Sequence, residues 1–277
     1  MMSQPVRKPM LYFFLTIAAL YLMMVTLLFV FQRSLIYHPS RDIVAPHSYG
    51  LAEFQDIRIQ TTDNVSIQMW YRPAKAGYPT IAYFHGNAGN LGDRSLIFSA
   101  LADQGFGVLG TGYRGYGKSD GAPSEQGLYA DARAAISYLT NTVGLSETEI
   151  ILYGESLGTG VATQMATEYK VGMLALQAPY RSLAGRAAEI YFYVPVKLLI
   201  KDKLYSIKKI ARVQAPLLVF HGELDNVIPL EHGKSIYEAA TSPKRAFFLP
   251  HVGHNDFDSN AVSAHLLDFA KEHGLVK

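Results

Sequence analysis

Two serines stand at the centre of a G-x-S-x-G pattern, in which a hydroxyl can act as the nucleophile of an acyl transfer. One copy is Gly154-Glu155-Ser156-Leu157-Gly158, and the other is Gly117-Lys118-Ser119-Asp120-Gly121. The chemistry needs a strained turn between a strand and a helix. Small residues two positions before and after the serine let the two elements approach each other.

The flanking residues favour Ser156 over Ser119. An apolar run at 150–153 precedes Ser156, and residues 157–170 can form a helix after it. Ser119 is instead followed by Asp-Gly-Ala-Pro, which is typical of a turn. We therefore predict Ser156 as the nucleophile, with Gly154 and Gly158 shaping its turn. The alternative interpretation is that Ser156 occupies a tight turn and has no catalytic role.

A serine hydroxyl needs a histidine base, and the histidine needs a carboxylate that holds its tautomer. His254 follows the last predicted strand, and Asp225 follows the strand before it. In a parallel sheet these residues and Ser156 would share the carboxyl edge, where ligands bind. The order Ser, Asp, His is also that of hydrolases built on this turn. We predict these three as a catalytic triad. The rivals are Glu223 or Asp256 for the acid and His251 for the base.

The oxyanion of an acyl transfer needs two backbone N–H donors. One is predicted at Leu157, directly after the nucleophile. The other is expected in the loop 84–90, where two glycines let the backbone approach a substrate closely, and we predict the N–H of Asn87. His85 and His221 each precede a glycine at a strand end, and we expect them to bond only to neighbouring backbone.

Composition and motifs argue against several other chemistries. The chain has no cysteine, which excludes disulfides, a thiol nucleophile and cysteine-bound metal. A net charge of +2 without a Lys/Arg run gives no sign of nucleic-acid binding. Residues 112–119 match the phosphate-loop pattern. A phosphate loop must be followed by a helix, but Asp-Gly-Ala-Pro follows here and disfavours one, so we expect no bound nucleotide. His251, His254 and Asp256 lack a metal-ligand spacing. We expect neither a metal nor an organic cofactor.

The elements that must position these residues alternate along the chain. The run at 65–71 alternates in polarity, as a half-exposed antiparallel strand does, whereas later runs are almost wholly apolar. This order predicts an α/β domain with a mostly parallel sheet and helices on both faces. The expected strands are 55–60, 65–71, 80–84, 106–110, 150–153, 173–177, 216–220 and 245–249, and the expected helices are 124–140, 157–170, 230–240 and 259–273.

A charge-free apolar segment of 22 residues runs from Met10 to Phe31. At about 1.5 Å per residue it can cross a hydrocarbon core of about 30 Å. A buried core helix is one alternative. A cleavable signal peptide is the other, but its apolar region is shorter and ends in small residues. We predict a single uncleaved transmembrane anchor in the lipid bilayer, after a tail at 1–9 and before a linker at 32–50 and a domain at 51–277.

The orientation of this span rests on a nearly even count of cations. Arg7 and Lys8 precede the span, and Arg33 and Arg41 follow it. The free amino terminus favours an N-terminus on the cytoplasmic side. We therefore expect the large domain on the extracytoplasmic side.

Six segments between residues 37 and 273 carry a resemblance to a known family. They are Phe84-His-Gly-Asn-Ala-Gly-Asn, Tyr113-Arg-Gly-Tyr-Gly-Lys-Ser, Gly154-Glu-Ser-Leu-Gly, Pro179-Tyr-Arg-Ser, His221-Gly-Glu-Leu-Asp and Gly253-His-Asn-Asp. With them the sequence resembles the α/β-hydrolases, and among these the membrane-anchored abhydrolase-domain serine hydrolases, a branch that includes protein depalmitoylases. The resemblance implies an eight-stranded sheet and a Ser156–His254–Asp225 triad. Gly112 departs from the family, where Asp usually precedes Tyr-Arg-Gly, but it touches none of the three catalytic groups.

Residues 183–213 lie between two predicted strands, where such folds insert a cap. Apolar groups alternate there with cations, six of them between Lys197 and Arg212, which suits either a surface on anionic lipid headgroups or an ordinary amphipathic cap. We expect a serine esterase or thioesterase whose substrate is a lipid-derived ester or an acyl thioester. A peptidase or amidase on the same triad, or a non-catalytic binding protein with this fold, are the alternatives.

Overall fold

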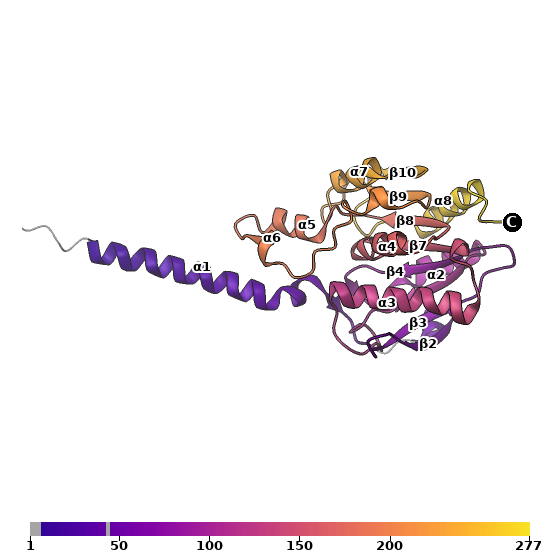
Figure 1. Ribbon diagram of the computed structural model, residues 1–277, viewed down its shortest axis with the longest axis horizontal. Helices are drawn as coiled ribbons and strands as arrows, with labels where there is room; N and C mark the ends of the chain where they lie inside the picture. The colour runs from indigo at the N-terminus through magenta and orange to yellow at the C-terminus, as the bar shows by residue number, and fades with distance from the viewer. Residues whose placement is uncertain (1–6, 43–44) are drawn as a thin grey trace, which may run out of the picture.

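The computed structural model describes residues 7–42 and 45–277, which form a long helix attached to an α/β domain (Figure 1). The predicted tail at 1–9 therefore lies outside the described residues over positions 1–6, and the predicted linker does so at 43 and 44. Helix α1, Arg7–Ile36, projects away from the domain.

Helix α1 is longer than the predicted apolar span because it continues through the first residues of the predicted linker. Two polar side chains in this extension bind the segment after α6. The Lys201 N–H donates to Gln32 Oε1 over 2.6 Å, and Arg33 Nε donates to Asp202 Oδ2 over 2.9 Å. These contacts attach the end of the helix to the domain.

All eight predicted strands form, and together they make one sheet in the order β10-β9-β8-β7-β4-β6-β3-β2. Strand β3 pairs antiparallel with β2 and β6, and the remaining neighbours are parallel. The prediction of a mostly parallel sheet is confirmed. The strands are β2 Gln55–Gln60, β3 Ser66–Arg72, β4 Thr80–Phe84, β6 Gly107–Thr111, β7 Ile150–Glu155, β8 Met173–Gln177, β9 Leu217–Gly222 and β10 Lys244–Leu249.

Helices cover both faces of the sheet and enclose two apolar cores (Figure 1). Helices α3 (Glu125–Ser137), α4 (Leu157–Glu168) and α7 (Leu230–Ala239) pack on one face, and α2 (Ser95–Asp103) and α8 (Ser259–Glu272) pack on the other. The four predicted helices are confirmed, and α3 continues as a π-helical turn, Tyr138–Val143. Helix α2 was not predicted, because its nine residues carry too many apolar side chains to show a helical period.

The insertion between β8 and β9 holds two short helices, α5 (Leu183–Ile190) and α6 (Val196–Leu199). They lie on the side of the domain from which α1 projects (Figure 1). Ala184, Val196 and Ile200 form a small apolar cluster there, and Ile36 of α1 packs against it. The short 3-10 turns are Pro46–Tyr49, Leu91–Arg94, Glu147–Glu149 and Ile210–Arg212.

The chain directly after α1 pairs with a loop of the domain. Strand β1, His38–Pro39, runs parallel to β5, Ala88–Gly89. The His38 N–H donates to the Asn87 carbonyl oxygen, and the Ser40 N–H donates to that of Gly89, each over 2.9 Å. The predicted linker is therefore hydrogen-bonded to the loop that carries Asn87.

Candidate active site

Ser156 stands on the turn between β7 and α4, as the motif predicts. Its φ of 49° and ψ of −113° are strained for a residue with a side chain. A Cβ at Gly158 would collide with the carbonyl oxygen of Phe84, and one at Gly154 would lie 2.6 Å from the carbonyl oxygen of Gly158. Both glycines are required because strand and helix approach too closely for any larger residue.

Three predicted side chains form a continuous hydrogen-bonded chain at the carboxyl edge of the sheet. His254 Nε2 lies 3.0 Å from Ser156 Oγ, and His254 Nδ1 lies 2.7 Å from Asp225 Oδ2. Asp225 follows β9 and His254 follows β10, so three separate strand ends supply the three groups. With the proton on Nδ1 facing the carboxylate, Nε2 is left as the acceptor for the serine hydroxyl.

The Asp225 carboxylate is fixed by more than the histidine. Its Oδ1 accepts the N–H groups of Val227 and Ile228 over 2.9 and 2.7 Å, and its side chain is fully buried. Burial alone would raise the pKa of this carboxyl, but hydrogen bonds from His254 and Ile228 outweigh it and lower the pKa below its ordinary value. Asp225 is therefore held as an anion beside His254.

The rival residues stand apart from this chain of contacts. Glu223 is exposed, and so are His251 and Asp256. Asp256 Oδ2 accepts the N–H of Gly253 over 3.1 Å, which closes the turn before His254. The geometry therefore brings together the predicted triad and leaves its alternatives in the surrounding loops.

The loop that carries Asn87 is held in place from three directions. The Asn87 carbonyl oxygen accepts the Tyr116 hydroxyl over 2.7 Å in addition to the His38 N–H. The Asn87 side chain donates to the carbonyl oxygen of Ile36, the last residue of α1, over 2.9 Å. Asn87, Leu157 and Ser156 line the same cavity, so both predicted oxyanion donors belong to residues beside the nucleophile.

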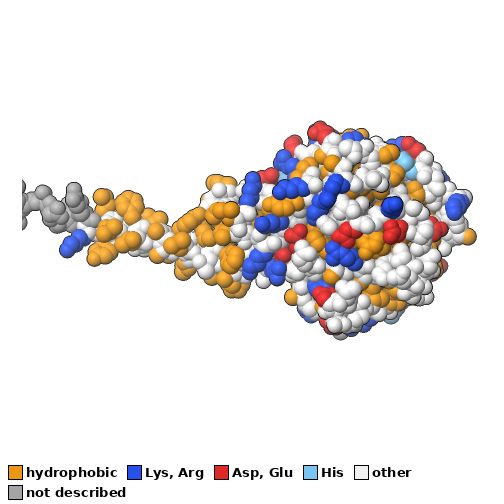
Figure 2. Space-filling view, in the orientation of Figure 1, with side chains coloured by type: hydrophobic (Ala, Val, Ile, Leu, Met, Phe, Trp, Pro, Cys, Tyr) orange, Lys and Arg blue, Asp and Glu red, His pale blue; other side chains and the backbone are white. Residues whose placement is uncertain are grey.

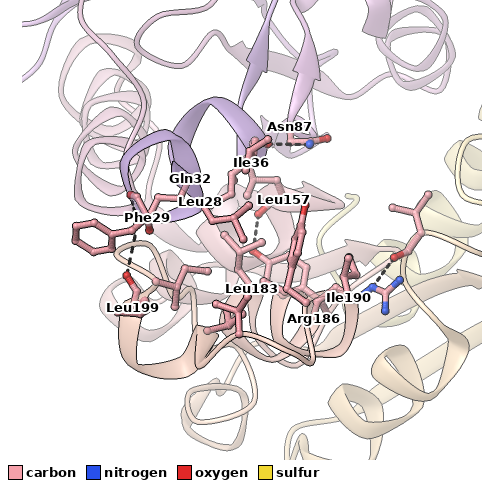
Figure 3. A pocket seen from close by; sticks show the side chains of 18 of the residues that line it. Leu28, Phe29, Gln32, Ile36, Asn87, Leu157, Leu183, Arg186, Ile190 and Leu199 are labelled. Carbon is pink, nitrogen blue, oxygen red and sulfur yellow. Dashed lines mark hydrogen bonds between the residues drawn. The ribbon is translucent and has the colours of Figure 1, made fainter. Parts of the chain in front are cut away.

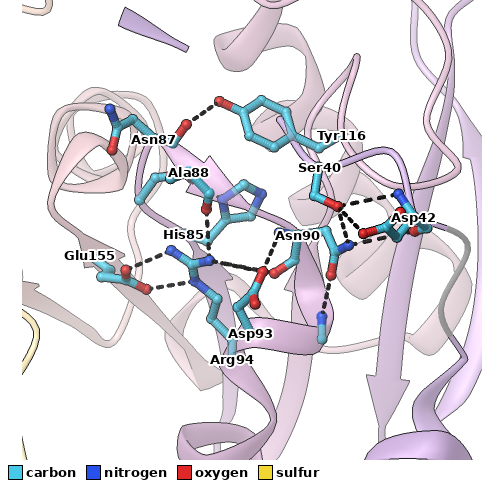
Figure 4. A network of polar contacts seen from close by, with 12 residues as sticks. Ser40, Asp42, His85, Asn87, Ala88, Asn90, Asp93, Arg94, Tyr116 and Glu155 are labelled. Carbon is cyan, nitrogen blue, oxygen red and sulfur yellow. Dashed lines mark hydrogen bonds and ion pairs between the residues drawn. The ribbon is translucent and has the colours of Figure 1, made fainter. Parts of the chain in front are cut away.

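An ion pair that sequence reasoning missed connects this loop to the nucleophile turn (Figure 4). Arg94 binds both carboxylate oxygens of Glu155, over 2.8 and 3.1 Å, and donates to the Ala88 carbonyl oxygen over 2.8 Å. Burial would raise the pKa of Glu155, but the charge and hydrogen bonds of Arg94 and the Tyr83 hydroxyl lower it. The available signal was a carboxylate directly before Ser156 at the end of an apolar strand.

Of the two histidines that precede glycines, His85 bonds to neighbouring backbone, as expected, whereas His221 Nε2 also lies 3.6 Å from Asp225 Oδ2. His85 is fully buried, contacts the Gly86 carbonyl oxygen through Nδ1 and lies against the Tyr113 ring. Burial lowers the pKa of His85 to about 3, so it stays neutral. His221 contacts the Ile228 carbonyl oxygen over 2.8 Å, and burial lowers its pKa as well. These rings fill the space under the active-site loops.

A cavity of about 260 Å³ opens at Ser156 (Figure 3). Its walls are largely aliphatic and aromatic side chains from three regions: the end of α1, the cap helices and the loop after β9. Across residues 7–42 and 45–277, no group of three or more His, Asp or Glu side chains is arranged to hold a metal ion. The cavity therefore offers room for an apolar group beside the Ser156 hydroxyl.

Comparisons with known proteins agree with this architecture. Residues 78–206 match a family model described as serine aminopeptidase. An uncharacterized protein of Mycobacterium tuberculosis is 39% identical over 234 residues, covering 84% of this chain and 83% of the relative. Alpha/beta hydrolase domain-containing protein 17C of Mus musculus is 35% identical over 191 residues, covering 69% of this chain and 58% of that protein.

A solved structure shares the fold. An esterase from Pyrococcus furiosus superposes with a TM-score of 0.67 at 19% identity, covering 86% of this chain and 97% of the esterase. The sheet, the nucleophile turn and these relatives define an α/β-hydrolase fold, which confirms the predicted fold class. The chain belongs to the α/β-hydrolase superfamily, as the resemblance of its motifs predicted. Its activity class is that of a hydrolase.

Proposed function

We propose that this hydrolase is a membrane-anchored serine esterase or thioesterase that acts on acylated or lipid-like molecules. The observation that carries the proposal is the contact chain from Ser156 through His254 to Asp225, which ends in an apolar cavity reaching α1. An ester or thioester offers a carbonyl to the serine and an apolar acyl group to the cavity. The esterase named above has the same fold.

In the proposed acylation step, Ser156 Oγ attacks the carbonyl carbon while His254 Nε2 accepts the hydroxyl proton. The carbonyl electrons move to oxygen, and the N–H groups of Leu157 and Asn87 stabilise this oxyanion. When the tetrahedral intermediate collapses, the bond to the leaving group breaks. The departing alcohol or thiol takes the proton from His254 and leaves an acyl-enzyme on Ser156.

Deacylation repeats these steps with water. His254 accepts a proton from water as its oxygen attacks the acyl carbon, and the same two N–H donors stabilise the second oxyanion. Collapse then releases the carboxylic acid, and His254 returns its proton to Ser156 Oγ. The Asp225 carboxylate stays ionised throughout and stabilises the imidazolium.

Helix α1 supports the membrane anchor. Its span Lys8–Ile36 is long and apolar enough to cross a bilayer, and none of its most apolar window is buried within the domain. Phe192 and Leu198 of the cap are 83% and 84% exposed. Figure 2 shows Lys and Arg side chains gathered on the domain where the helix joins it. This arrangement suits a bilayer with anionic headgroups. The expected sidedness, with the N-terminus in the cytoplasm, stays a prediction.

A peptidase is the second candidate, because the matching family model is described as a serine aminopeptidase. An aminopeptidase must bind a terminal ammonium group, for which a carboxylate is the usual partner. The described residues that line the cavity include no Asp or Glu, and their one charged side chain is Arg186. Arg186 is occupied by the Val227 carbonyl oxygen and Glu189, at 2.7 and 3.1 Å. The cavity therefore favours an acyl group over a peptide terminus.

The experiment treats membranes that carry the full chain with a fluorophosphonate probe, which labels activated serines. We expect labelling of the wild type in the membrane fraction and none of Ser156→Ala, with both proteins showing the same thermal melt. Matched ester, thioester and amide substrates then separate the two candidates. Faster amide turnover would favour the peptidase, and a folded wild type that neither labels nor hydrolyses any of them would favour a binding protein.

A further inference from the structure

The cavity at Ser156 has one unusual wall, which is the membrane helix itself (Figure 3). Val25, Leu28, Phe29, Gln32 and Ile36 all line it. Their spacing of three or four residues places them on one stripe of α1. From the first to the last, this stripe extends about 17 Å along the helix axis at 1.5 Å per residue. A hydrolase domain that was merely tethered would not need this contact.

The cap supplies the opposite wall. Leu183, Ile190 and Leu199 face the α1 stripe across the cavity (Figure 3). The exposed side chain of Ile190 continues this wall outward to the surface. Apart from Gln32 and Arg186, both walls are mostly aliphatic and aromatic, so the space between them suits an unbranched hydrocarbon chain better than a polar group.

Polar contacts join α1 to the cap segment. Close to the domain, the Gln32 side chain binds the N–H of Lys201, and Arg33 pairs with Asp202. Farther along the helix, the Tyr21 hydroxyl donates to the Tyr193 carbonyl oxygen over 2.9 Å. These contacts lie on either side of Val25, Leu28 and Phe29 along the helix. The cavity is therefore bounded by two segments that are bonded to each other in this structure.

The position of the stripe relative to the apolar span decides where the cavity leads. Val25, Leu28 and Phe29 lie inside the charge-free segment, whereas Ile36 lies beside Asn87 at the active site. One end of the cavity therefore lies beside the predicted membrane span, and the other end lies at Ser156. The residues that line the cavity extend from the predicted membrane span to Ser156.

We propose that α1 forms the acyl-binding channel of this enzyme together with the cap. The substrate is then a long-chain acyl ester or thioester that enters sideways from the bilayer, with its carbonyl at Ser156 and its methyl end toward Val25. This inference rests on the proposed esterase or thioesterase function. Each methylene that enters the channel raises kcat/KM by up to about fourfold, until the channel is filled.

The test uses two adjacent leucines of α1 as a matched pair. Leu28 lines the cavity, whereas Leu27 is exposed on another side of the helix. Full-length wild type, Leu28→Trp and Leu27→Trp are assayed in the same vesicles with p-nitrophenyl esters of butanoic, dodecanoic and hexadecanoic acid. We expect Leu28→Trp to lower the dodecanoyl-to-butanoyl ratio of kcat/KM at least about tenfold, from the loss of several methylene contacts. Leu27→Trp should keep the wild-type ratio.

A second variant measures length along the channel. Val25 lies three residues farther from the active site than Leu28, or about 4.5 Å along the axis. Val25→Trp should therefore spare the dodecanoyl ester and act mainly on the hexadecanoyl ester. Equal ratios in Leu28→Trp and Leu27→Trp would overturn the proposal. Equal loss of all three esters in a variant that still reacts with fluorophosphonate, or cut-offs in the reverse order, would overturn it as well.

Failure of the channel and failure of the esterase function give different results. If the wild type hydrolyses esters and labels at Ser156 but shows no dependence on chain length, the channel is wrong and the function stands. If a folded wild type neither labels nor hydrolyses any ester, the proposed function fails, and the channel proposal fails with it. Recovery of the same thermal melt in all three tryptophan variants excludes misfolding as the cause of a changed ratio.

Discussion

The two copies of the G-x-S-x-G pattern place their serines in opposite environments. Ser156 stands on a strained turn at the sheet edge, where its Oγ contacts His254 and opens onto the cavity. Ser119 lies in the turn between β6 and α3 with 2% of its surface exposed. Its hydroxyl donates to the Gly112 carbonyl oxygen and accepts the Gln68 N–H, each over 2.8 Å.

The glycines of the two copies also serve different purposes. Gly158 is needed because β4 passes directly against it. Gly121 is needed for a backbone φ of 78°, which L-residues rarely adopt. The segment after Ser119 forms no helix before α3 begins at Glu125, so it also lacks the helix N-terminus that a phosphate loop uses. The same five-letter pattern thus builds a strained turn beside a cavity in one place and a buried hydrogen-bonded turn in the other, because the flanking elements differ.

The largest expected difference between the copies is catalytic. Ser156→Ala should lower kcat by at least about 10⁴-fold, because no nucleophile remains. Ser119→Ala should change kcat far less, since its hydroxyl has no contact with the triad. Steady-state ester hydrolysis by the two purified full-length variants measures this. A loss of similar size in both would remove the distinction between the two serines.

The second largest expected effect concerns the contact between His254 and Asp225 behind Ser156, since Ser119 has no histidine partner. Asp225→Asn should lower kcat by about 10⁴-fold, because the amide no longer holds the His254 tautomer. The lowered pKa of Asp225 adds a dependence on pH. A carboxyl whose pKa is depressed on folding contributes stability above its unfolded pKa of about 4 and loses it as pH falls through the folded pKa.

The wild type should therefore lose more thermal stability than Asp225→Asn between about pH 5 and pH 2. Melting curves of both proteins across this range measure the difference. Parallel curves would mean that Asp225 carries no charge linked to folding.

Gly158 and Gly121 should differ in how much their substitution lowers the free energy of unfolding, which is a smaller effect than the loss of activity. Gly158→Ala forces a Cβ into the backbone of β4 and should destabilise the fold by more than about 3 kcal/mol. Gly121→Ala meets the Val65 side chain at 3.3 Å and the Arg114 Cβ at 3.6 Å, and should lose about 1–2 kcal/mol from the positive φ. Denaturant unfolding of the two variants compares them directly. A larger loss in Gly121→Ala would contradict the close-approach explanation.

The smallest effect concerns the structural role of Ser119. Ser119→Ala removes a donor and an acceptor from a buried turn and should lower the free energy of unfolding by about 1–3 kcal/mol. Ser156→Ala should leave the unfolding midpoint close to that of the wild type. Measuring both midpoints in the same detergent completes the comparison, and a stability loss confined to Ser156→Ala would reverse the assigned roles.

Much of the fold could be predicted from local patterns. The apolar runs identified every strand of the main sheet, and the turn residues separated Ser156 from Ser119. The positions of Asp225 and His254 after consecutive strands were enough to expect them near the serine, because parallel strands end at one edge. Helix α2 escaped prediction because it is short and apolar on several sides.

The contacts that support the site could not be predicted from local sequence patterns. Arg94 and Glu155 lie 61 positions apart, and neither belongs to a pattern that indicates pairing. The pairing of β1 with β5 joins the chain after α1 to the Asn87 loop across about 50 residues. Such contacts depend on how loops close over the finished sheet, which sequence spacing does not record.

The sequence by itself determined the strands of the main sheet and most of the long helices, and it pointed to hydrolase chemistry. Hydrophobic period, turn residues and the G-x-S-x-G context act over a few residues, so they are visible along the chain. Only the tertiary structure decided that the last turns of α1 line the cavity at Ser156. The apolar run that predicts a membrane span looks the same whether one of its faces meets lipid alone or also the cap. That choice comes from packing between distant segments, where burial and polar contacts such as Arg33 with Asp202 fix the position of α1.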